Sequence, residues 1–108
     1  MTRYRGYPSA LGQFWHLPKH TKHRERAADR EHRVDMVITA EQRWMGVLHP
    51  ENSDSIFSSR KTLCRFVPLT PRMLAELEVG RSYTIAHGPV TLGKLQVEVI
   101  ETGSEFLP

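Results

Sequence analysis

The stretch that decides the fold is residues 79–101, VGRSYTIAHGPVTLGKLQVEVIE. It contains two runs in which apolar and polar residues alternate. The apolar residues that share a face are Tyr83 and Ile85 in the first run and Leu95, Val97 and Val99 in the second. Alternation with a period of two is typical of strands that have one buried and one exposed face. Gly88-Pro89 between the runs predicts the turn of a β-hairpin, because glycine tolerates a positive φ and proline fixes its own φ.

Other parts of the chain carry shorter strand patterns. We expect strands at residues 34–39 and 62–67, and either a strand or a turn of helix at residues 44–48. The run at 62–67 is apolar enough to be buried on much of both faces, and residues 13–17 can form a further short strand. Gly93, just before the second arm of the hairpin, predicts a β-bulge or a close approach of two backbones.

One short helix is predicted between the strands. Thr70-Pro71 has the residue types of a helix start, with Thr70 as the N-cap and proline at the first helical position. Gly80 predicts the end of this helix. We expect its apolar contacts to come from Met73, Leu74 and Leu77.

The order of these elements predicts a mainly β fold with one or two short helical segments. Short strands separated by turns form an antiparallel barrel or sandwich, since closure removes exposed strand edges. The chain has 108 residues, and we expect a single domain over residues 1–108. Its 39% hydrophobic and 25% charged residues are typical of a globular protein.

Composition also indicates the compartment. No apolar run approaches the roughly 20 residues that a transmembrane helix requires. The N-terminal stretch lacks the continuous apolar core of a secretory signal. Cys64 is the single cysteine, which excludes an internal disulfide and a cysteine-based zinc site, and we expect it to be buried. These features favour the cytoplasm.

Residues 19–33, KHTKHRERAADREHR, form a charged segment with almost no apolar residues. We expect a flexible insertion or, alternatively, a short exposed helix. The net charge of +3 makes a polyanionic partner one option. The candidates for contact with RNA phosphates are Lys19, Lys22, Arg24, Arg26, Arg30, Arg33, Arg60 and Lys61, with Tyr4, Tyr7 or Trp15 available for stacking. Acidic residues interleaved in the segment weaken its positive potential.

Two kinds of catalytic site have partial support. His16, His20 and His23 have i, i+4, i+7 spacing, which would align three imidazoles around zinc on a helix, although Pro18 interrupts that helix. Cys64 could be the nucleophile of a cysteine hydrolase, although no motif links it to a base. A Gly-x-x-x-x-Gly-Lys-[Ser/Thr] sequence is absent, which excludes a nucleoside-triphosphate site of that type. The sequence therefore favours a protein without catalysis, metal or cofactor.

Residues 64–101 contain a series of short motifs in a characteristic order. They are Val67-Pro68-Leu69-Thr70-Pro71, Val79-Gly80, Tyr83-Thr84-Ile85, Gly88 and Thr91-Leu92-Gly93-Lys94-Leu95-Gln96-Val97. This series resembles the third, C-terminal domain of the translation elongation factor Tu family, although Leu95 stands where that family has a second glycine. The resemblance implies a small antiparallel β-barrel. It also lends support to RNA contact, because that barrel touches the tRNA backbone in the family.

These observations predict a non-catalytic binding module that acts through a protein partner, docked on the barrel or on the charged segment. The alternative is RNA-backbone binding through the basic segment at 19–33. A small metal-dependent or cysteine hydrolase is the remote third hypothesis. The protein and RNA hypotheses differ in their expected response to salt, since phosphate contacts weaken steeply as ionic strength rises.

Overall fold

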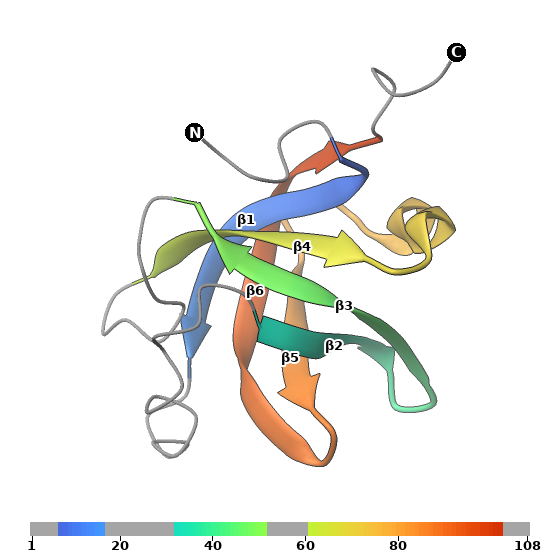
Figure 1. Ribbon diagram of the computed structural model, residues 1–108, viewed down its shortest axis with the longest axis vertical. Helices are drawn as coiled ribbons and strands as arrows, with labels where there is room; N and C mark the ends of the chain where they lie inside the picture. The colour runs from blue at the N-terminus through green and yellow to red at the C-terminus, as the bar shows by residue number, and fades with distance from the viewer. Residues whose placement is uncertain (1–6, 17–31, 52–60, 103–108) are drawn as a thin grey trace.

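The computed structural model describes residues 7–16, 32–51 and 61–102, which form a closed antiparallel barrel of six strands and one short 3-10 helix (Figure 1). The strands are β1 (Ser9–His16), β2 (His32–Thr39), β3 (Gln42–Pro50), β4 (Thr62–Pro68), β5 (Ser82–His87) and β6 (Val90–Glu101), with helix η1 (Pro71–Glu76) between β4 and β5. The order around the barrel is β1-β4-β3-β2-β5-β6, and β6 pairs with β1 to close it. The predicted mainly β fold and its barrel form are confirmed.

The predicted hairpin is present as β5 and β6. His87 pairs with Val90 across the Gly88-Pro89 turn, and Gly88 has a φ of +59°. Tyr83 and Ile85 of β5 are buried, as the alternation predicted. The same holds for the first part of β6, where Leu95 and Val97 lie in the core.

The prediction that Val99 shares this buried face is wrong. Val99 is 46% exposed. Leu11 of β1 pairs with Val99 and Gly12 pairs with Val97, so Glu98 has no residue opposite it. One extra residue in a strand inverts the alternation beyond it. The bulge at Glu98 therefore turns Val99 outward.

Two glycines allow β1 and β6 to approach closely. A Cβ atom on Gly12 would lie 1.9 Å from the Gln96 carbonyl oxygen, and one on Gly93 would lie 2.2 Å from the Trp15 carbonyl oxygen. At Gly93 the register with β5 also shifts, which leaves Leu92 as the extra residue of a bulge. The prediction of a bulge or a close approach at Gly93 is confirmed, because the close approach is at Gly93 and the bulge is at the adjacent Leu92.

Helix η1 follows the prediction in part. It begins at Pro71, after Thr70, but the Thr70 side chain makes no capping hydrogen bond. The helix ends at Glu76, because Leu77 is already extended, so the predicted end at Gly80 is wrong. Gly80 instead adopts a φ of +93° in the turn before β5.

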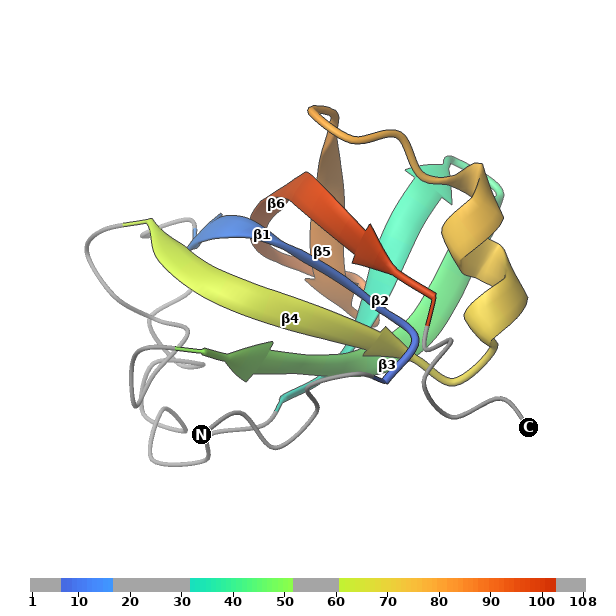
Figure 2. The ribbon, with the colours of Figure 1, turned by 90° about the horizontal axis from the view of Figure 1, so that it is seen from above.

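The expected apolar residues of η1 reach the core. Met73, Leu74 and Leu77 are all buried, and η1 packs against one end of the barrel (Figure 2). No helix in the described part of the chain has the length and apolar content to span a membrane.

Other predicted segments have longer or different bounds. Residues 13–17 were predicted as a short strand, and β1 covers 9–16. Residues 44–48 lie within β3, which resolves the choice between strand and helix in favour of a strand. Residues 19–31 of the charged segment, including its alternative helix, lie outside the described residues. His32 and Arg33, the last two residues of that segment, belong to β2.

We predict that Gly12→Ala lowers the free energy of unfolding by about 3 kcal/mol, because its methyl group would overlap the Gln96 carbonyl and separate β1 from β6. Urea unfolding followed by circular dichroism measures the change. Gly88→Asn is the matched control, since the space around Gly88 is open and asparagine tolerates positive φ. The control should change stability by less than about 0.5 kcal/mol. Unaltered stability of Gly12→Ala would contradict the close approach.

Candidate functional site

The outer face of β3 and β4 carries four apolar side chains, of which two are exposed and two are half-buried. The residues of this outer patch are Met45, Val47, Val67 and Leu69. Val47 pairs with Val67, and the Leu69 amide donates to the Met45 carbonyl at 3.0 Å, so the members are neighbours across the two strands. Met45 is 49% exposed and Leu69 is 62% exposed. A contiguous apolar surface of this kind is a feature of docking sites.

A surface hollow of about 260 Å³ adjoins the outer patch at Met45. We call it the cationic hollow, and its lining residues are Arg33, Val34, Asp35, Met45, His87 and Gly88. These residues come from β2, from β3, from the end of β5 and from the β5–β6 turn. The hollow therefore exists only because the β5–β6 hairpin packs beside the β2–β3 hairpin.

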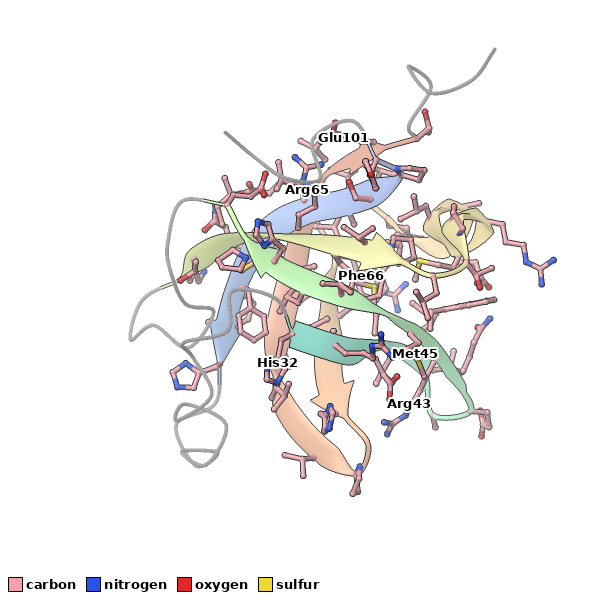
Figure 3. All side chains as sticks on the ribbon, viewed as in Figure 1. His32, Arg43, Met45, Arg65, Phe66 and Glu101 are labelled. Carbon is pink, nitrogen blue, oxygen red and sulfur yellow. The ribbon has the colours of Figure 1, made fainter. Side chains whose placement is uncertain are left out.

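Arg43 connects these two hairpins at the edge of the hollow. Its Nη1 atom donates a hydrogen bond to the Gly88 carbonyl at 2.7 Å and lies 3.7 Å from Asp35 Oδ2. Figure 3 shows Arg43 and Met45 near each other on the outer side of the hairpin. The ion pair compensates part of the negative charge that Asp35 brings to the hollow.

Two histidines flank the same region. His87 Nδ1 lies 3.1 Å from the Arg33 carbonyl oxygen, which makes Nδ1 the donor, and the rings of His32 and His87 are 6.1 Å apart between centroids. His87 is exposed at the end of β5, beside the hairpin turn.

Only two of the eight predicted phosphate-binding cations lie in the described residues. Arg33 is exposed on β2, and Lys61 is exposed just before β4 with its Nζ atom 4.9 Å from the centroid of the Trp15 ring. Arg33 pairs with Val47, which pairs with Val67, so Lys61 lies two strands away and on the order of 20 Å along β4. The structure does not bring them together. The other six, Lys19, Lys22, Arg24, Arg26, Arg30 and Arg60, lie outside the described residues.

The predicted metal ligands fall partly within the described residues. His16 is the last residue of β1 and is 9% exposed, whereas His20 and His23 lie outside the described part. Because His16 lies in a strand, it is not part of the helix that the spacing of the three histidines suggested. Across residues 7–16, 32–51 and 61–102, no group of three or more His, Cys, Asp or Glu side chains is placed to hold a metal ion.

Cys64 is fully buried in the barrel, as predicted. Burial, and secondarily the charge of Glu51, raise the pKa of the Cys64 thiol well above its usual range. The thiol is therefore protonated at neutral pH. Because the thiolate is the reactive form, this environment does not support the cysteine-nucleophile hypothesis.

A buried ion cluster that no sequence pattern predicted surrounds Arg65. This residue is only 3% exposed. Its Nε and Nη2 atoms donate to Glu51 Oε1 at 3.2 Å and 3.0 Å, and its Nη1 atom donates to Ser9 Oγ at 2.8 Å and also to Glu101 Oε1. Figure 3 shows Arg65 directed toward Glu101. The cluster links β4 with β1, with β6 and with the residue that follows β3.

The electrostatics of this cluster stabilise the charged form of Arg65. Burial alone would lower the pKa of its guanidinium, but the hydrogen bonds and charges of Glu101 and Glu51 outweigh burial and raise that pKa. The sequence did contain a signal: an arginine within a run expected to be buried on both faces requires a carboxylate partner. The partner itself was not identifiable, because Glu51 and Glu101 are distant in the chain.

Comparison with known proteins gives no assignment. No protein-family model, curated protein or solved structure matches the chain.

We predict that Arg65→Met lowers the free energy of unfolding by about 3–5 kcal/mol, because Glu51 would remain buried without its partner. Chemical unfolding measures this loss. Adding Glu51→Gln to Arg65→Met should recover part of the stability, since it removes the unpaired charge. Arg81→Met is the control, since the Arg81 side chain is 60% exposed. Equal losses in Arg65→Met and Arg81→Met would refute the role of the buried cluster.

We predict that a thiol reagent modifies Cys64 only when the protein unfolds. The folded chain should stay unmodified at pH 8 under conditions in which urea-unfolded protein reacts completely. Burial raises the pKa of the thiol in the folded protein above its value in the unfolded chain. The stabilising contribution of the protonated thiol is therefore present at neutral pH. It is lost as the pH rises past about 8.5, because the unfolded chain releases the proton first. The loss in free energy of unfolding caused by Cys64→Ala, relative to wild type, should therefore be smaller at alkaline than at neutral pH. Rapid modification of the folded protein would contradict the burial.

Proposed function

We propose that the protein is a non-catalytic binding module that docks a protein partner on the outer patch. The placement of Met45 and Leu69 is the observation that carries the proposal. They lie side by side across two strands, and each exposes about half or more of its surface. The barrel core is filled by other residues, so these two side chains are not needed to complete it. Methionine is enriched at protein interfaces, and charged rims such as Arg33, Asp35 and Arg43 commonly surround them.

We also propose that the barrel is related to the third domain of the elongation factor Tu family. The closed six-stranded antiparallel form supports this relation. The motif residues Gly88 and Gly93 occupy the turn and the bulge of the β5–β6 hairpin. Gly88 supplies the positive φ of the turn, and Gly93 leaves room for the Trp15 backbone, which accounts for their part in the resemblance.

A capture experiment with matched variants tests the docking proposal. Tagged wild-type protein, a Met45→Glu/Leu69→Glu variant and a Val79→Glu control are each cross-linked in extract of the source cells, and captured proteins are identified by mass spectrometry. Val79 is 63% exposed and lies outside the outer patch. We expect the same protein to be captured by wild type and control, with at least about a tenfold loss in the double variant, as for loss of an interface anchor.

Two outcomes of this experiment would contradict the proposal. One is capture that does not change in the double variant, or no specific capture at all. The other is loss of the captured protein after ribonuclease treatment, which would indicate that RNA connects the two. Circular dichroism of each variant establishes that the barrel is still folded.

RNA-backbone binding is the second candidate function. Trp15 pairs with Lys94 in the β1–β6 register and has Lys61 over its ring at 4.9 Å, so an aromatic side chain lies between two exposed lysines. Aromatic rings beside cations are a common arrangement in proteins that bind single-stranded nucleic acid.

We predict for this second function that labelled single-stranded RNA binds more weakly at 200 mM than at 50 mM salt, and that Lys61→Ala reduces the slope of log affinity against log salt by about one. Fluorescence anisotropy measures both effects. Arg81→Ala, an exposed arginine on another part of the barrel, should leave the slope unchanged. Lack of RNA binding at 50 mM salt would eliminate this function.

A further inference from the structure

The cationic hollow has a charge pattern suited to an anion. Arg33 lines it directly, and Arg43 lies at its edge. Asp35 is the one carboxylate among its lining residues, and the 3.7 Å contact with Arg43 offsets that charge. Two arginines against one aspartate leave a net positive charge, even when His32 and His87 are neutral. An anion entering the hollow would therefore meet an attractive potential.

The hollow is large enough for a side chain, and the arginine at its edge is held in a fixed position. Its volume of about 260 Å³ equals that of about nine water molecules at ~30 Å³ each, so it can hold one side chain together with some water. Arg43 uses its Nη1 atom to bind the Gly88 carbonyl, which holds the guanidinium against the β5–β6 turn. A guanidinium that is already held loses less conformational freedom when it binds a ligand.

We propose that the cationic hollow receives an aspartate or glutamate side chain of the protein partner. This inference rests on the proposed function, because the outer patch adjoins the hollow at Met45 and would hold the apolar residues beside that acidic side chain. The partner segment is then a short sequence in which a carboxylate is followed or preceded by a large apolar residue.

The lining favours a carboxylate from protein over a phosphate from RNA. Met45 gives the hollow an exposed apolar side chain, and the outer patch continues that apolar surface. RNA-backbone contact instead uses several cations spaced along a path. In the described part of the chain, the other predicted cation, Lys61, lies far from the hollow, so no such path of cations leads to it.

Titrating ¹⁵N-labelled protein with a defined pair of dipeptides tests this inference. The probe is N-acetyl-glutamyl-leucine amide, and its control is N-acetyl-glutaminyl-leucine amide, which has the same shape without the charge. We expect saturable amide shifts at Arg33, Met45 and Gly88 with the glutamyl probe. Binding of the glutaminyl control should be weaker by about fivefold, the factor for one solvent-exposed charge pair.

Variants of the protein supply the second arm of the experiment. Arg33→Gln and Arg43→Gln should each weaken glutamyl-probe binding by about fivefold. Arg81→Gln should not change it, because this exposed arginine lies outside the hollow. Equal binding of both dipeptides, no shifts at these residues, or no effect of either hollow variant would overturn the inference. Tighter binding of inorganic phosphate than of the glutamyl probe would do the same and would reassign the hollow to phosphate.

The inference can fail separately from the proposed function. If Leu69→Glu abolishes capture of the partner while Arg33→Gln and Arg43→Gln do not, the outer patch is a docking surface and the hollow is not its carboxylate site. If the glutamyl probe binds in the hollow but capture does not depend on the outer patch, the hollow binds carboxylates and the docking proposal fails.

Discussion

Closure of the barrel between β1 and β6 is the constraint on which the rest of the structure depends. Gly12 and Gly93 permit it, because any side chain at either position would meet the backbone of the facing strand. Bulges at Leu92 and Glu98 adjust the twelve-residue β6 so that it can pair with β5 on one side and β1 on the other. Once closed, the described sheet has no free edge, so binding through strand addition is unavailable to it. The binding surfaces proposed for this sheet accordingly lie on the outer faces of its strands.

Two arginines illustrate how burial separates a structural role from a binding role. Arg65 is almost fully buried, and its donors are directed to Glu51, Glu101 and Ser9. Such a cluster holds strands in place and offers little to a ligand, since breaking it would leave a buried charge. Arg43 is exposed, and a single nitrogen makes its contacts with Gly88 and Asp35. It can bind a further group at small energetic cost, because solvent screens the charges around it.

The two proposed modes of binding use different sides of the molecule. The protein-docking proposal uses the outer faces of β3 and β4 with the hollow beside β2, whereas the RNA proposal uses Trp15 between Lys61 and Lys94. The exposed apolar side chains support protein docking. The aromatic ring between two lysines supports RNA binding. RNA binding should weaken steeply as salt rises, whereas apolar docking should be far less sensitive to salt. One salt titration therefore distinguishes the two proposals. The outer patch ranks first because it combines exposed apolar area with a shaped hollow.

The sequence by itself determined the β class, the β5–β6 hairpin, the Gly93 bulge and the buried state of Cys64, because each depends on neighbours in the chain or on side-chain type. Tertiary structure alone decided the rest. Val99 turned outward because β1 imposes a bulge at Glu98, and no local pattern encodes the partner strand's register. The Arg65 cluster and the cationic hollow join residues from separate strands. Alternation shows which side of a strand a residue occupies, but only the closed barrel determines which residues then meet.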